Sequence, residues 1–120
     1  MKNKIEGYKL PQGRIFVLRS NTYFSAGVLY LAPHKALEKH NRPVAEQLRQ
    51  VIGSSTIKLF KDNKRIQKVK LNKGNHLVIP ANQFHVHSNI TSKSSVTIWR
   101  FDGNITKIID DIRNGYKKLL

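Results

Sequence analysis

Apolar residues along most of the chain come in short β-prone runs that are separated by turn residues. Such runs are typical of strands, in which successive side chains point to opposite faces of a sheet. The strands predicted in this way cover residues 14–18, 22–31, 46–52, 56–60, 66–71, 76–79, 84–88 and 96–101. A hairpin turn is predicted at Asp62, Asn63 and Lys64. Eight strands at this spacing favour a sandwich or a closed barrel.

Near the end of the chain, the apolar residues follow the period of a helix instead of that of a strand. Apolar side chains recur there at helical spacing, at Ile105, Ile108, Ile109, Ile112, Tyr116 and Leu119. Asp102 is a good N-cap residue, and Lys117 and Lys118 suit the negative end of a helix dipole. We therefore predict one amphipathic helix over about residues 103–119. It would pack on a barrel formed by about residues 12–101.

Length and composition limit the classes of protein that fit. The 120 residues are enough for one compact domain, expected to span residues 1–120. The chain has no cysteine, which excludes disulfides, thiolate zinc sites, iron–sulfur clusters and thiol nucleophiles. No apolar run approaches the roughly 20 residues of a membrane helix. The first residues also lack the apolar stretch of a signal peptide, so we expect a soluble cytoplasmic protein.

The charge balance is strongly basic, with 22 Lys and Arg against 7 Asp and Glu, a formal net charge of +15. A field of this sign favours anionic partners. Many of the cations crowd one predicted hairpin, at Lys58, Lys61, Lys64, Arg65, Lys68, Lys70 and Lys73. A run like this is usually a solvated sheet face, although it could also follow the phosphates of a nucleic acid. Phe60 is the hairpin's single aromatic residue, so specific nucleic-acid recognition is not expected.

The histidines carry the most informative spacing. His40, Arg42 and Glu46 differ by even numbers and therefore share one face of an extended chain. The same parity continues from Glu46 to Gln50, and His85 and His87 also share a face. Two imidazoles and one carboxylate that converge on a cavity would form a facial metal site with positions left for water or substrate.

Two segments with these residues resemble the motifs of the cupin superfamily. The first motif, HxHx3-4Ex6G, is matched by His40-x-Arg42-x3-Glu46-x6-Gly53. The second, Gx5PxGx2Hx3N, is matched by Gly74-x5-Pro80-x-Asn82-x2-His85-x3-Asn89. The resemblance implies an all-β fold, a double-stranded β-helix or jelly-roll barrel, here with a C-terminal α-helix. It also implies a ligand pocket at one barrel mouth, and homodimers are common in the family.

The chain departs from the family pattern at three positions. His34 stands where the family often has a glycine, and Asn82 replaces the glycine after the motif proline. Asn tolerates the left-handed backbone that glycine adopts. Arg42 stands where the family places its second histidine ligand, and a guanidinium has no acceptor atom to bind a metal. Transfer of the family's ligands thus leaves His40, Glu46 and His85, with His87 as a substitute for the missing imidazole.

Two interpretations of Arg42 stay open at this point. In the first, a divalent ion (Fe, Mn, Ni or Zn) is bound and Arg42 holds the negative group of a substrate, with Gln50 as a further polar contact. The protein would then be a metal-dependent enzyme acting on a small anionic metabolite such as a sugar acid or sugar phosphate. In the second, Arg42 pairs with Glu46 and the protein is a metal-free small-molecule binding module. The basic nucleic-acid-associated protein described above is the third alternative.

Overall fold

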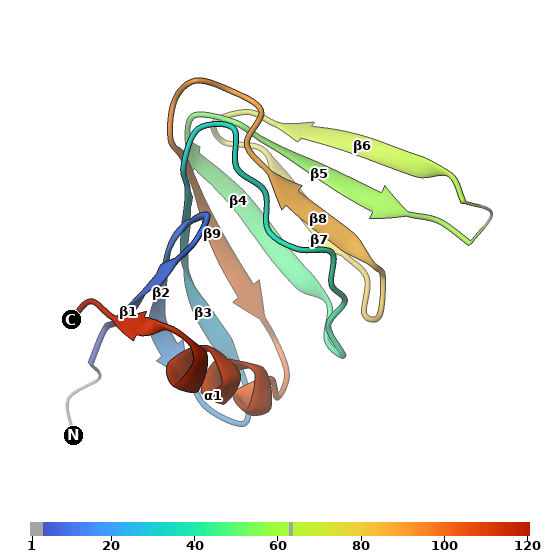
Figure 1. Ribbon diagram of the computed structural model, residues 1–120. Helices are drawn as coiled ribbons and strands as arrows, with labels where there is room; N and C mark the ends of the chain where they lie inside the picture. The colour runs from blue at the N-terminus through green and yellow to red at the C-terminus, as the bar shows by residue number, and fades with distance from the viewer. Residues whose placement is uncertain (1–3, 63) are drawn as a thin grey trace.

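The computed structural model describes residues 4–62 and 64–120, which form two antiparallel β-sheets and one helix (Figure 1). The elements are β1 (Glu6–Leu10), β2 (Gly13–Ser20), β3 (Ser25–Leu31), β4 (Glu46–Ile52), β5 (Ser55–Phe60), β6 (Ile66–Leu71), β7 (His76–Ile79), β8 (His85–Ser88), β9 (Ser95–Phe101), α1 (Thr106–Gly115) and β10 (Lys117–Lys118). The large sheet has the order β10-β1-β2-β3-β9-β4-β7, and the small sheet has the order β6-β5-β8. All eight predicted strands are present, with ends that shift by three residues at most. The predicted turn at residues 62–64 includes Asn63, which lies outside the described residues.

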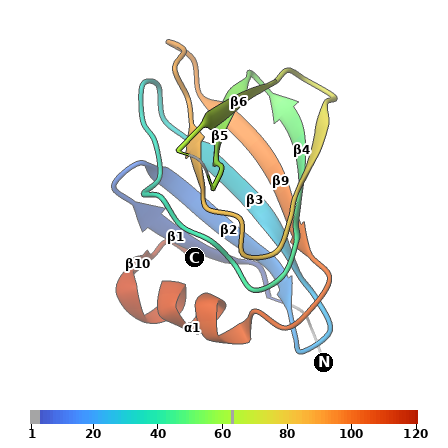
Figure 2. The ribbon, with the colours of Figure 1, turned by 90° about the vertical axis from the view of Figure 1, so that its right-hand side faces the viewer.

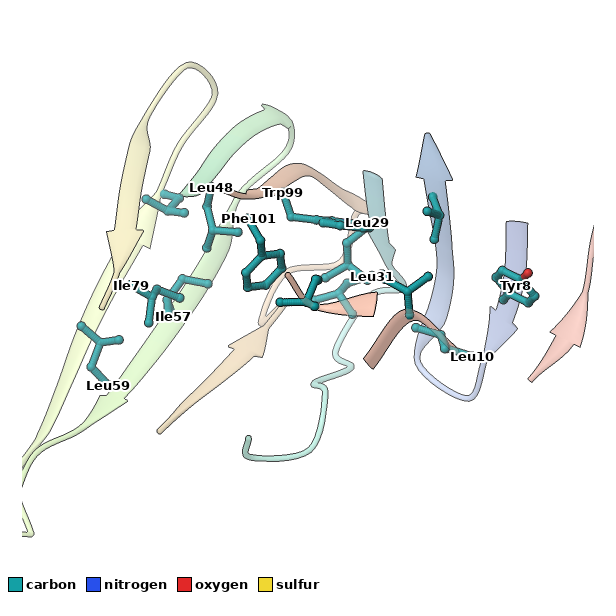
Figure 3. Packing of buried hydrophobic residues seen from close by; sticks show 14 residues of the cluster. Tyr8, Leu10, Leu29, Leu31, Leu48, Ile57, Leu59, Ile79, Trp99 and Phe101 are labelled. Carbon is teal, nitrogen blue, oxygen red and sulfur yellow. The ribbon is translucent and has the colours of Figure 1, made fainter. Parts of the chain in front are cut away.

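The core lies between the two sheets (Figure 3). Alternate residues of β4 and β9 point inward, as the period of a half-buried strand requires. Leu48 and Trp99 contribute from the large sheet, and Ile57 and Leu59 contribute from the small sheet. The β5–β6 hairpin projects beyond the rest of the molecule (Figure 1), and Lys61, Asp62 and Lys64 between its strands are exposed.

The chain between β3 and β4 lies along the free edge of β8. Two isolated bridges join Ala36 to Ser88 and His40 to His85. In the second bridge the backbone N–H of each histidine donates to the carbonyl of the other, at 3.0 and 2.9 Å. The small sheet is therefore extended by a segment without regular strand structure, and this pairing places His40 directly beside His85.

The C-terminal helix is shorter than the predicted span of 103–119. It begins at Thr106, and Asp102 does not cap it. The carboxylate of Asp102 instead accepts hydrogen bonds from Arg100 Nε and Gln47 Nε2, which hold it against the end of the large sheet. No helix in the described ranges is long and apolar enough to cross a membrane.

The residues after Gly115 are extended rather than helical. Lys117 and Lys118 form β10, which pairs with Lys9 and Tyr8 of β1. The helix-dipole role expected for these two lysines is therefore wrong, because pairing with the free edge of β1 satisfies their backbone groups. β1 itself was not predicted, since Gly7 and its charged neighbours interrupt the apolar pattern there.

An ion pair ties α1 to the large sheet. Arg113 donates from Nε to Glu6 Oε1 at 2.7 Å and from a terminal nitrogen to Glu6 Oε2 at 2.8 Å. These hydrogen bonds lower the pKa of the Glu6 carboxyl, although burial opposes the shift. Ile105 and Ile109 add buried apolar contact, so α1 is fixed across one end of the molecule (Figure 2).

Gly27 provides a test of how closely the large sheet packs. A Cβ at this position would lie 2.0 Å from the Phe16 carbonyl oxygen and 2.3 Å from the Trp99 ring. We expect Gly27→Ala to lower the free energy of unfolding by about 2 kcal/mol or more, because backbone and indole must both move. Urea denaturation followed by far-UV circular dichroism measures the effect.

Gly115→Ala is the matched control, because nothing lies within 4 Å of its added Cβ. Its stability should be unchanged or higher by about 0.5–1 kcal/mol, since alanine restricts the unfolded chain. Equal effects of the two substitutions would contradict the packing described for Gly27.

Candidate metal centre

Four side chains converge at one end of the space between the sheets. They are His40, Glu46, His85 and His87, and one ligand atom of each lies within 4.8 Å of the others. Glu46 is the first residue of β4, and the two histidines of β8 share a face as their spacing predicts. His40 joins them through its bridge to His85.

The Glu46 carboxylate is buried, with 6% of the residue exposed. Its Oε1 lies 3.2 Å from His85 Nε2 and 3.3 Å from His87 Nε2. Within the described part of the chain, however, neither Glu46 Oε1 nor His85 Nε2 has a partner in hydrogen-bond geometry. Buried polar atoms normally have a partner. Two unsatisfied atoms this close together therefore mark a place for a further group.

The Nδ1 atoms of His40 and His85 have partners that fix the tautomers of these two rings. His40 Nδ1 lies 2.9 Å from the carbonyl oxygen of Glu38, and His85 Nδ1 lies 2.7 Å from that of Gln83. A carbonyl oxygen only accepts, so both Nδ1 atoms carry the proton and donate it. In neutral rings each Nε2 then presents a lone pair to the cluster. The same arrangement orients histidine ligands in metal sites.

Burial and neighbouring charges set the ionisation of the cluster. Burial opposes ionisation of Glu46, whereas the imidazoles of His87 and His85 lower the pKa of this carboxyl when their Nε2 atoms carry a proton. Burial, the nearby Arg42 cation and the other two imidazoles lower the pKa of His40 to about 3. A carboxylate and a neutral imidazole are the forms that bind divalent ions.

The dimensions of the cluster fit one ion. Two atoms bonded to the same ion at roughly 2.1 Å lie at most about 4.2 Å apart. The observed span of 4.8 Å exceeds this by about 0.6 Å, a difference that small side-chain movements close. Imidazole and carboxylate ligands suit Fe, Mn, Ni and Zn. Together with the two unsatisfied atoms, this donor set fits a divalent metal.

Arg42 lies beside the cluster without an anionic partner. Its one hydrogen bond is a long contact of 3.4 Å from a terminal nitrogen to the Asn41 carbonyl. Among residues 4–62 and 64–120, no carboxylate lies within ion-pair distance of it, although Glu46 and Asp111 lie close enough to attract its charge. Burial lowers the pKa of Arg42, but a guanidinium remains charged at neutral pH.

Two adjoining cavities give access to these residues. The inner one has a volume of about 60 Å³ and is lined by His40, Arg42, Glu46 and His87 on its polar side. The outer one, of about 270 Å³, also reaches His40 and Arg42. The apolar side of the inner cavity is formed mainly by Trp99, Phe101, Ile105, Ile108, Ile109 and Ile112.

Gln50 does not belong to this group, although its strand position shares the parity of Glu46. The side chain is 1% exposed, and its amide makes four hydrogen bonds. The nitrogen donates to the Ile52 carbonyl and Ser95 Oγ, and the oxygen accepts from Ser55 and Thr97. An amide has four such positions. The structure therefore leaves no part of Gln50 for the substrate contact that we expected.

Two residues that replace glycines of the motif pattern adopt the left-handed backbone that glycine favours. His34 and Asn82, which replace glycines of the pattern, have φ angles of 59° and 64°. The Asn89 amide nitrogen donates to the carbonyls of Leu31, Ala32 and Lys93. The end of the second motif is thereby tied to the end of β3.

The residues that sequence reasoning missed are those of the helix that cover the site. Their spacing predicted a packing face, but it contained no information on which end of the barrel the helix would cover. The other candidates lie elsewhere. His76 is exposed on β7, and the lysines of the β5–β6 hairpin include a directly opposed pair, Lys58 and Lys68. His34 also lies outside the four-residue cluster.

The buried His40 ring makes stability dependent on pH. Histidine in an unfolded chain has a pKa near 6.5, whereas that of folded His40 is about 3. The unfolded state therefore binds a proton first as the pH falls. From this residue we expect a loss of about 1 kcal/mol of unfolding free energy between pH 7 and 5.5 in metal-free protein.

Urea unfolding in the presence of a chelator at several pH values measures this loss. His40→Gln should show a shallower decline over the same interval, whatever its absolute stability. Parallel curves for the two proteins would contradict the depressed pKa of His40.

Comparisons with known proteins find similarity in structure but not in sequence. No protein-family model matches the chain, and no curated protein sequence matches it significantly. The oxalate decarboxylase of Lactobacillus farciminis, in a formate complex, superposes with a TM-score of 0.74 and 17% identity over 96% of this chain and 33% of its own. A variant of the Bacillus subtilis oxalate decarboxylase superposes with a TM-score of 0.72 and 14% identity, over 92% of this chain and 28% of its own.

Oxalate oxidase in complex with glycolate gives a TM-score of 0.63 and 17% identity over 67% of this chain and 42% of its own. The chain thus spans about two fifths of the oxidase and a third or less of the decarboxylases. Both kinds of enzyme are cupin-type proteins. The superposition includes nearly the whole of the present chain, with its two antiparallel sheets and C-terminal helix. The protein therefore has the cupin fold that its two motifs predicted.

Proposed function

We propose that this protein is a metal-dependent enzyme that acts on a small anionic metabolite. His40, Glu46, His85 and His87 are the metal ligands in this proposal. The observation that carries it is the pair of buried, unsatisfied atoms, Glu46 Oε1 and His85 Nε2, 3.2 Å apart. Without a cation a carboxylate oxygen faces an imidazole lone pair, an arrangement that costs free energy. A divalent ion between them removes that cost.

Arg42 supplies the second half of the proposal. A cation that is half-buried and unpaired is costly, and an anionic ligand offsets this cost. The guanidinium has a planar fork of donors that matches a carboxylate. We assign to Arg42 the binding and orientation of the substrate's negative group next to the metal ligands, in place of the histidine that the family has there.

The remaining roles follow from burial and hydrogen bonding. The Glu38 and Gln83 carbonyls hold the His40 and His85 rings in the tautomer that leaves Nε2 free. The isoleucines of α1 limit the access of water to the inner cavity. When bound, a divalent ion supplies Lewis acidity, and Fe or Mn adds one-electron redox chemistry. The similarity to oxalate decarboxylase and oxalate oxidase, determined with formate and glycolate, supports a small carboxylate as the substrate.

Metal content tests the ligand set. We expect about one equivalent in tag-free protein after reconstitution with Fe(II), Mn(II), Ni(II) or Zn(II). His85→Ala should lose it, because the ligand between Glu46 and His40 is missing. Plasma mass spectrometry measures the content, and circular dichroism checks that the variant is folded.

His76→Ala is the matched control, since this histidine is exposed on β7 and outside the cluster. It should keep the full equivalent. Retention of metal by the His85 variant, or a wild-type protein that takes up none, would contradict the proposal. The second result would favour the metal-free binding module.

Replacement of Arg42 tests the anion site independently of the metal. Arg42→Leu should retain metal but bind glycolate at least about tenfold more weakly, because a charge-assisted contact to a partly buried cation is lost. Calorimetric titration of metal-loaded protein measures the affinity. Arg49→Leu is the control, since Arg49 is exposed on the outer face of the same strand. Equal glycolate affinity of the two variants would refute the role of Arg42.

A further inference from the structure

The cavity above the candidate metal centre has one polar side and one apolar side. Arg42, His40, Glu46 and His87 form the polar side. The rest of the lining is made of branched aliphatic and aromatic groups, among them Ile105 and the α1 residues Ile108, Ile109 and Ile112. The side chains of these four isoleucines present no hydrogen-bonding group. The two sides therefore favour a ligand that is itself charged at one end and apolar at the other.

The size of the inner cavity limits the apolar part of such a ligand. Each water-sized sphere needs about 10–15 Å³ of this kind of volume. A cavity of about 60 Å³ therefore holds about four to six non-hydrogen atoms. Beyond it, the outer cavity of about 270 Å³ also borders Arg42 and Ile112, so a ligand can enter along this side.

The polar groups within reach are few. Arg42 has no carboxylate partner within the described residues, and its one contact to Asn41 is long. Trp99 is 4% exposed and lines the inner cavity, and its Nε1 has no hydrogen-bond partner in the described part of the chain. Apart from the metal ligands, the polar lining of the cavity is thus one cation, whose guanidinium suits one carboxylate.

From these observations we propose that the substrate is a short aliphatic carboxylate, with its carboxylate at Arg42 and an apolar body of about four to six heavy atoms against the isoleucines of α1. The inference rests on the proposed function and names the substrate class of the same site. A sugar acid or sugar phosphate fits less well, because its hydroxyl groups would be buried against isoleucine without hydrogen-bond partners.

Ligand titrations with three matched probes test the proposal. 4-Methylpentanoate has a carboxylate and five further carbons, 4-methylpentanamide has the same shape without charge, and gluconate has six carbons with hydroxyl groups. Zn(II)-loaded protein avoids redox side reactions and paramagnetic quenching. Trp99 is the only tryptophan of the chain and lines the cavity, so its fluorescence reports occupancy, with calorimetry as a second readout.

We expect 4-methylpentanoate to bind at least about tenfold more tightly than its amide, because the amide cannot pair with Arg42. It should bind about 100-fold more tightly than gluconate, whose hydroxyls lose their water. Ile112→Thr should weaken 4-methylpentanoate binding about tenfold and leave the metal content unchanged. Ile90→Thr is the matched control, since Ile90 is 65% exposed and outside both cavities, and it should bind like wild type.

The outcomes separate this inference from the proposed function, because metal content is measured on the same samples. A metal-loaded protein that binds gluconate as well as 4-methylpentanoate would overturn the aliphatic substrate class and leave the metal centre intact. Equal effects of Ile112→Thr and Ile90→Thr would also overturn it. A protein that takes up no metal but ranks the three probes as expected would support the ligand class while contradicting the metal-dependent function.

Discussion

Glu46 places a carboxylate in the interior of the protein, where only 6% of the residue is exposed. Desolvation of such a group is compensated only by cations or hydrogen-bond donors placed around it. Here the nearest groups are the Nε2 atoms of His85 and His87. The Nδ1 protons of His40 and His85 are donated to the carbonyls of Glu38 and Gln83. The backbone thus presents lone pairs to a carboxylate, an arrangement that a divalent ion stabilises.

The rest of the fold holds this arrangement in place. β4 supplies the carboxylate, β8 supplies two imidazoles, and the irregular segment along the edge of β8 supplies the third. α1 covers the opening with isoleucines and is fixed to β1 by the pair of Arg113 and Glu6. In the proposed site, Arg42 stands at the position of the second histidine in the motif and binds the substrate's negative group. His87, two residues further along β8 than His85, offers an imidazole in compensation.

Much of this arrangement could be predicted from the sequence, because it depends on local periodicity. The parity of His40 and Glu46 and of His85 and His87 placed each pair on one face of a strand, and the two motifs predicted the barrel that brings them together. The positive φ angles at His34 and Asn82 follow from their glycine positions in the pattern. For Gln50, strand parity correctly predicted an inward-facing side chain but not its surroundings. The amide meets three hydroxyl groups and a carbonyl, and parity does not distinguish these partners from a cavity.

Other features depended on contacts that sequence periodicity does not contain. Helical spacing predicted the buried face of α1, but only the tertiary structure shows that this face lies beside the cluster of His40, Glu46 and His87. Asp102 looked like a helix cap, yet Arg100 and Gln47 compete for its carboxylate. β1 forms because it pairs with β2, and β10 forms because it pairs with the other edge of β1. Neither short segment carries enough apolar pattern to be recognised alone. The unpaired state of Arg42 is likewise a property of the assembled site.

The central claim is that one ion binds to three imidazoles and one carboxylate. X-ray absorption spectroscopy of the protein reconstituted with Zn(II) tests it most directly, because imidazole rings add characteristic outer-shell scattering. We predict nitrogen and oxygen ligands at about 2.0–2.2 Å with outer-shell scattering from about three imidazoles. A spectrum of oxygen ligands alone, without imidazole scattering, would contradict the claim and show that the ion binds elsewhere on the protein.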